Sequence, residues 1–135
     1  MHVAIDLGST ITYLACWDAE ESPANARIKV KLPGVAELNP AIAPVWGRDN
    51  LHGYISYIYR EYLLPSRKII ESAALSVPDI FSLNQRRLLL DICEEILGLP
   101  QVMILPHYMA MINGYHLAHD NLKGDILVID GTSPP

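Results

Sequence analysis

Apolar and polar residues follow one another along the chain with two different periods, one typical of strands and one typical of helices. Short apolar or β-rich runs bounded by turn residues predict strands, and apolar residues spaced three and four apart predict helices. Strands are predicted at 2–8, 10–18, 26–32, 71–77, 102–105 and 125–130. Helices are predicted at 51–64, 86–97 and 107–118.

Residues with strong end preferences mark where two of these helices begin and stop. Asn50 predicts an N-cap for the first helix, and Pro65 predicts its end. Ser82 and Gln85 have the spacing of a capping box ahead of the second helix, and Gly98 supplies its C-terminal stop.

The predicted order of elements, β-β-β-α-β-α-β-α-β, indicates an α/β fold. Three antiparallel strands that lead into βαβ crossovers build a mixed sheet with helices on both faces. This is the ribonuclease H-like arrangement. Its unit is complete at about residue 120, so the strand at 125–130 is additional to it.

Composition narrows the class of protein. The chain has 135 residues, half of them apolar, which suits a single domain, and its net charge of −5 argues against a nucleic-acid partner. Cys16 and Cys93 lack metal-ligand spacing and predict buried free thiols. Asp6 interrupts the apolar start where a signal peptide would lie, and no apolar run approaches the ~20 residues of a membrane span. We therefore expect a cytoplasmic protein with no membrane partner.

Two stretches place an aspartate at the end of a strand, followed by glycine and a hydroxyl residue. In the first, Asp6 precedes Gly8, Ser9 and Thr10; in the second, Asp130 precedes Gly131 and Thr132. Such a turn offers hydroxyls and amides to an anion, and the aspartate can hold Mg²⁺ through water. The alternative for the first stretch is a capped β-turn, because Asp, Gly and Ser are all turn formers.

Several segments, in order along almost the whole chain, resemble the superfamily of ATPases that contains actin, the heat-shock chaperones and the sugar kinases. "IDLGST" resembles its first phosphate loop, and "LVIDGT" resembles the second, on the strand that opens the other lobe. "VPDIFSLNQRR" is similar to a chaperone segment, and "ILGLPQVMIL" and "AIAPVWGR" are similar to actin segments. The resemblance implies Mg-ATP binding and hydrolysis in the parent protein.

The resemblance also assigns roles to individual residues. Asp6 would order water around Mg²⁺, Asp130 would be the second acidic residue near the metal and the attacking water, and Ser9 and Thr10 would contact the β- and γ-phosphates. His107 stands where the family has a Gln or Glu that orients the water; a histidine can do the same, but beside Pro106 it is also typical of a helix cap or the surface. The candidate catalytic residues are Asp6, His107 and Asp130, and the candidate metal ligands are Asp6 and Asp130. The candidate cofactor-binding residues are Gly8, Ser9, Thr10, Gly131 and Thr132.

Departures from the family define the expected domains. Residues 1–121 would form one ribonuclease H-like lobe, with only a minimal insertion near 33–49 in place of the outer subdomain. Residues 122–135 would hold the first strand and the shortened phosphate loop of a missing second lobe, because Pro134 and Pro135 stand where the family continues with glycines.

Three functions follow as hypotheses. The first is a truncated or partial nucleotide-binding ATPase that binds Mg-ATP weakly or not at all and hydrolyses it negligibly, because the nucleotide cleft needs both lobes. The second is an interaction module that pairs with itself or a protein partner through the strand at 125–130, as a dimer or larger assembly. The third, a ribonuclease H-type nuclease, rests on the fold alone and lacks further well-placed carboxylates.

Overall fold

The computed structural model describes residues 1–8, 11–18, 20, 28–33, 48–79, 81–99, 102–107 and 109–110. Within these residues the strands are β1 (His2–Asp6), β2 (Ile11–Trp17), β3 (Ile28–Pro33), β4 (Ser72–Val77) and β5 (Val102–Pro106). The helical segments are α2 (Arg48–Ile58), the π-helical turn η2 (Tyr59–Leu63), the 3₁₀ turn η3 (Leu64–Ser66) and α3 (Leu83–Leu97).

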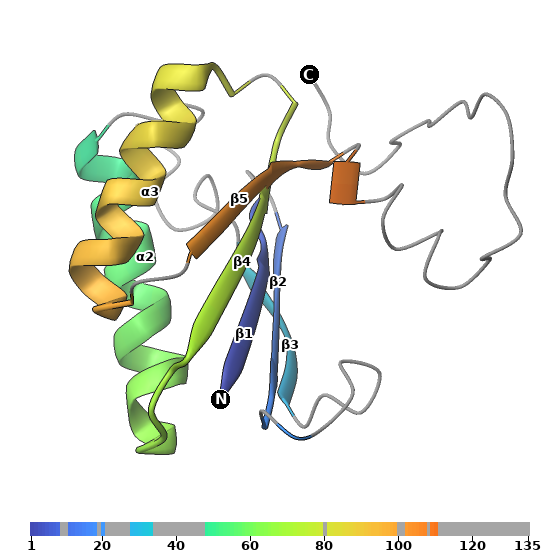
Figure 1. The fold of residues 1–135 in the computed structure, drawn as a ribbon, viewed down its shortest axis with the longest axis vertical. Helices are drawn as coiled ribbons and strands as arrows, with labels where there is room; N and C mark the ends of the chain where they lie inside the picture. The colour runs from blue at the N-terminus through green and yellow to red at the C-terminus, as the bar shows by residue number, and fades with distance from the viewer. Residues whose placement is uncertain are drawn as a thin grey trace, which may run out of the picture.

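The strands form one mixed sheet in the order β3-β2-β1-β4-β5. β1 and β2 pair antiparallel, as do β2 and β3, whereas β1 pairs parallel with β4 and β4 with β5. Figure 1 shows α2 and α3 side by side on one face of this sheet. The predicted α/β fold, with three antiparallel strands followed by parallel crossovers, is confirmed. Of the helix expected at 107–118, the structure describes only residues 107, 109 and 110.

The hydrophobic core lies between the sheet and the two helices. Alternate residues of the central strands point into it, because successive side chains of a strand face opposite sides of the sheet. The side chains that fill the core from β1 and β4 are Val3, Ile5, Ala73, Leu75 and Val77, and those from the helices are Leu51, Ile55, Ile58, Leu89, Ile92 and Cys93. The remaining residues of β1, His2, Ala4 and Asp6, therefore lie on the opposite face.

The first helix differs from its prediction at both ends. It begins at Arg48, so Asn50 lies inside its first turn and is not the N-cap. Helical backbone also continues past the expected end: the chain widens into η2 and then tightens into η3, where Pro65 occupies one of the first two positions. A proline is tolerated there because the amide hydrogen that it lacks has no partner in a first helical turn. The helical run ends instead at Arg67, which has a left-handed φ of 57°.

The second helix begins and ends as predicted. The Ser82 hydroxyl accepts a hydrogen bond from the Gln85 amide at 3.1 Å, and the Gln85 side chain accepts one from the Ser82 amide at 2.8 Å. This reciprocal pair is the capping box. At the other end Gly98 adopts a φ of 65°, which a residue with a Cβ adopts only under strain.

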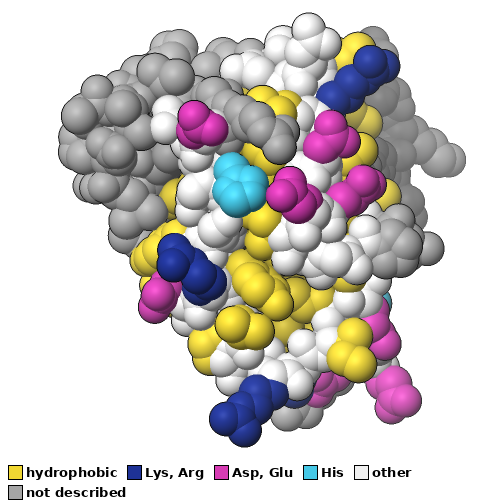
Figure 2. Space-filling model, turned by 90° about the vertical axis from the view of Figure 1, so that its left-hand side faces the viewer, with side chains coloured by type: hydrophobic (Ala, Val, Ile, Leu, Met, Phe, Trp, Pro, Cys, Tyr) yellow, Lys and Arg dark blue, Asp and Glu magenta, His cyan; other side chains and the backbone are white. Residues whose placement is uncertain are grey.

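The outer surface of the helices carries a mixed, mostly acidic set of side chains. Figure 2 looks onto this side and shows carboxylates gathered around a histidine, with apolar side chains nearby. Across the two helices, His52 Nε2 lies 3.9 Å from Glu95 Oε1. No helix within the described residues is both long and apolar enough to cross a membrane.

Both cysteines are buried free thiols, as predicted. Burial raises the pKa of the Cys93 thiol from 9.0 to about 12, with a smaller contribution from the nearby Glu94 carboxylate. Burial likewise raises the pKa of Cys16. The folded protein therefore keeps the Cys93 proton in a pH range where the unfolded chain has lost it.

This difference predicts an alkaline loss of stability that depends on Cys93. The contribution is fully present below pH 9 and is lost as the pH rises from 9.0 toward 12, the pKa of the folded state, at up to about 1.4 kcal/mol per pH unit. Urea unfolding between pH 8 and 11 should show a shallower pH slope in Cys93→Ala. The control Ile92→Val should lower the free energy of unfolding at every pH without changing the slope, and equal slopes in Cys93→Ala and wild type would contradict the assignment.

Candidate functional site

The carboxyl ends of three parallel strands meet at one edge of the sheet. Asp6 is the last residue of β1, and its register partner on β4 is Ser76. His107 directly follows β5. In open α/β sheets, ligands bind outside the carboxyl ends of the strands. The usual place is beside a central strand from which the chain builds the sheet outward to both sides. β1 is such a strand, because β2 and β3 lie on one side of it and β4 and β5 on the other.

The Asp6 carboxylate is held by groups from both neighbouring segments. Ser76 Oγ donates a hydrogen bond to Asp6 Oδ1 at 2.7 Å, and His107 Nε2 lies 2.9 Å from the same oxygen. The Asp6 side chain is nonetheless 51% exposed. A carboxylate that is fixed in position and still reaches solvent can meet a ligand without the large cost of a fully buried charge.

His107 is buried against the end of β1, although it lies 100 positions beyond Leu7. Its side chain is 8% exposed, and its Nε2 also lies 3.1 Å from the carbonyl oxygen of Leu7. Leu7 continues the pairing of β1 with β4, because its amide donates to the carbonyl oxygen of Ser76 at 2.8 Å. His107 therefore fastens the segment after β5 to the end of β1, and it does not lie on the surface.

The backbone that leaves β1 turns sharply at Gly8. A Cβ at this position would overlap the carbonyl oxygen of Ile11, so no other residue fits without a shift of the backbone. The buried Thr12 closes the turn: its hydroxyl accepts from the Gly8 amide at 3.1 Å and donates to the Gly8 carbonyl at 3.4 Å. The Thr12 side chain also hydrogen-bonds to Tyr54 of α2, whose pKa burial raises to about 12.

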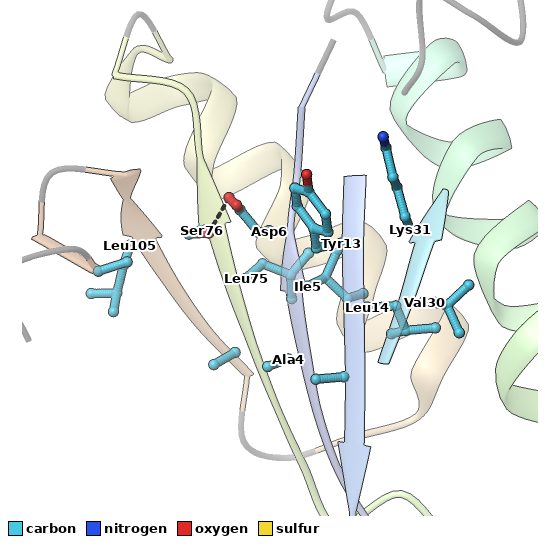
Figure 3. Close-up of a pocket in the computed structure, with 13 residues that line it drawn as sticks. Ala4, Ile5, Asp6, Tyr13, Leu14, Val30, Lys31, Leu75, Ser76 and Leu105 are labelled. Atoms are coloured by element: carbon cyan, nitrogen blue, oxygen red, sulfur yellow. Dashed lines mark hydrogen bonds between the residues drawn. The ribbon is translucent and has the colours of Figure 1, made fainter. Parts of the chain in front are cut away.

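A cavity of about 520 Å³ opens on the face of the sheet opposite to α2 and α3, and Asp6 lies among its lining residues. Three alanines from neighbouring strands, Ala4, Ala15 and Ala74, leave room for it. Figure 3 shows Asp6, Tyr13 and Lys31 extending toward the same end of this cavity. They belong to one register row across β1, β2 and β3, which continues through Ser76 to Leu105.

Of the site residues expected from the sequence, the structure brings together Asp6 and His107, and it places Gly8 in the turn that follows β1. Ser9, Thr10, Asp130, Gly131 and Thr132 lie outside the described residues, and so does the strand expected at 125–130. Two further residues that hold the site, Ser76 and Thr12, were not anticipated. Each is a polar residue within an otherwise apolar strand sequence, which marks it as unusual. Its partner, however, can be identified only once the register of the sheet is known.

The donors at this edge suit magnesium better than a metal that prefers a full set of protein ligands. Mg²⁺ keeps several water ligands and is held through one or two carboxylates together with substrate phosphates. Asp6 supplies one such carboxylate, exposed and fixed. Within the part of the chain that is described, no three His, Cys, Asp or Glu side chains gather closely enough to hold a metal ion by themselves.

The fold is that of one lobe of an actin-like ATPase. It is similar to the crystal structure of MreB5 of Spiroplasma citri bound to ADP, with a TM-score of 0.50 and 11% sequence identity. The match covers 79% of this chain and 38% of the MreB5 chain, so this chain spans well under half of that protein's length. The sequence matches no family model, and no curated protein is detectably similar to it.

The turn after β1 gives a test with a matched control inside the chain. Gly8→Ala should lower the free energy of unfolding by about 2–3 kcal/mol, because the new methyl overlaps the Ile11 carbonyl. In the control Gly53→Ala, in α2, the new methyl has no other atom within 4 Å. This variant should raise the free energy of unfolding by about 0.5–1 kcal/mol. Chemical denaturation of both variants measures this, and an unchanged Gly8→Ala protein would contradict the close approach.

Proposed function

We propose that this edge of the sheet binds the phosphates of a nucleotide together with Mg²⁺, with Asp6 directed at the hydrated metal. The observation that carries the proposal is the Asp6 carboxylate, fixed by Ser76 and His107 at the end of a central parallel strand and half exposed. The similarity in fold to an ADP-bound MreB5 supports a nucleotide as the ligand.

The sharp turn at Gly8 supports the same ligand class. Because Gly8 has no side chain, the backbone after Asp6 can approach the Ile11 carbonyl closely. Next along the chain are Ser9 and Thr10, for which the sequence predicts contacts to phosphate oxygens. Amides and hydroxyls in such a turn suit an anion, and Asp6 suits its counter-cation.

Asp6 would hold Mg²⁺ through water, and Mg²⁺ when bound would neutralise the phosphate oxygens. Hydrolysis of the nucleotide requires more groups than this edge of the sheet provides. In actin-like ATPases the nucleotide lies between two lobes, and closure of the cleft excludes bulk water and completes the site. The match to MreB5 covers 79% of this chain but only 38% of the MreB5 chain. We therefore expect this chain alone to bind Mg-ADP or Mg-ATP weakly and to hydrolyse ATP negligibly.

Replacement of the carboxylate tests the proposal. Asp6→Asn keeps an oxygen that can accept from Ser76 but removes the charge, so Mg-ADP affinity should fall about tenfold or more while the fold is retained. Asp91→Asn removes the same charge from an exposed position on α3 and should leave the affinity unchanged. Titration by NMR or calorimetry, with and without Mg²⁺, measures both.

Two results would overturn the proposal. One is the absence of any Mg-ADP binding by the wild-type chain at millimolar nucleotide, and the other is equal affinity in Asp6→Asn and wild type. Micromolar affinity with steady ATP turnover by this chain would instead overturn the expectation that it is catalytically incompetent.

A further inference from the structure

The contacts of His107 at the end of β1 assign it a role that the family pattern does not supply. We propose that His107 is a positioning residue: its Nε2–H donates to Asp6 Oδ1 and the Leu7 carbonyl, and together with Ser76 it fixes the carboxylate that faces the ligand. This inference rests on the proposed function, because the carboxylate is positioned for Mg²⁺ and phosphate.

The hydrogen on Nε2 follows from its neighbours. Nε2 lies 3.1 Å from the Leu7 carbonyl oxygen, which can only accept a hydrogen bond. It also lies 2.9 Å from Asp6 Oδ1, the oxygen that already accepts a hydrogen bond from Ser76 Oγ. An unprotonated Nε2 would direct its lone pair at two acceptors, so this nitrogen carries the hydrogen.

Ser76 completes the arrangement from the other direction. It lies opposite Asp6 in the parallel register of β1 and β4, and its hydroxyl donates to the oxygen that faces His107. One donor from β4 and one from the residue after β5 thus hold the same oxygen, and rotation of the carboxylate away from them would lose both hydrogen bonds. Hydrogen bonds to a charged group are the stronger kind, which makes this a firm constraint.

These contacts favour positioning over the orientation or deprotonation of water through Nε2. A base accepts a proton with a lone pair, and the lone pair of Nε2 is replaced by the hydrogen that Asp6 and Leu7 receive. The side chain is also 8% exposed, so the ring is packed against the protein over nearly all of its surface.

The test compares the affinity for Mg-ADP in wild type and in variants that lack one of the two donors. His107→Leu and Ser76→Ala each remove one donor, and each should weaken Mg-ADP binding about fivefold to tenfold. His107→Gln restores an N–H donor at a similar reach and should return the affinity to within about twofold of wild type. Ser72→Ala is the matched control, because it removes a hydroxyl on the same strand and face that contacts His2.

A ligand-free signal distinguishes failure of this inference from failure of the proposed function. In protein with ¹³C-labelled aspartate carboxylates, the Asp6 resonance should shift in Ser76→Ala and His107→Leu and remain in place in Ser72→Ala. If wild type binds no Mg-ADP but Asp6 shifts as described, the proposed function fails and the positioning of the carboxylate stands.

The inference itself is overturned in either of two cases. In the first, the Asp6 resonance is unchanged in Ser76→Ala, a variant that does not depend on replacement of a buried ring. In the second, a folded His107→Leu protein keeps both the wild-type Asp6 resonance and the wild-type Mg-ADP affinity. Thermal unfolding of every variant identifies any that has failed to fold.

Discussion

The parallel pairing of β1 with β4 is the interaction on which the rest of the structure depends. It places β1 at the centre of the sheet, with its apolar residues Val3 and Ile5 beneath the helices, and it sets Asp6 opposite Ser76. A shift of one residue in this register would turn the buried residues of β1 to the other face. The hydrophobic core therefore fixes the register, and the register fixes which polar groups meet at the edge.

The site lies at the end of the strands because a charge is costly elsewhere in this sheet. A carboxylate one residue earlier on β1 would take the place of Ile5, which is buried beneath the helices, where water cannot solvate it. At the last residue, Asp6 keeps half of its surface in solvent and still reaches donors on β4 and after β5. The hydrogen bonds between Gly8 and Thr12 close the backbone tightly just beyond Asp6.

Local patterns in the sequence predict most of the fold, and long-range geometry accounts for what they miss. The period of two along β1, β2 and β4 and the capping box of α3 involve only neighbouring residues, so the sequence shows them directly. Asn50 and Pro65 are wrongly predicted as helix ends. The helix already begins at Arg48, and the helical backbone continues past the end of α2 by changing to a wider π-helical turn and then to a tighter 3₁₀ turn that accommodates Pro65. Asp6 is a recognisable candidate from its own loop, but its contact with His107 depends on three parallel strands ending together.

Resemblance to a family indicates which position in this sequence corresponds to a functional position of the family. The role of the residue found there depends on the side chains that surround it. The resemblance of this sequence to the actin-like ATPases implies that His107 stands where those proteins have Gln or Glu, and these residues would behave differently beside Asp6. A Gln can donate an N–H to the Asp6 carboxylate and the Leu7 carbonyl, as the histidine does. A Glu in the same place would set a second carboxylate against Asp6, and the repulsion would force one of them to bind a proton, a metal ion or a different rotamer. Histidine at 107 is therefore compatible with this edge as a donor, and a direct change to Glu would alter the electrostatics of the site as well as one side chain.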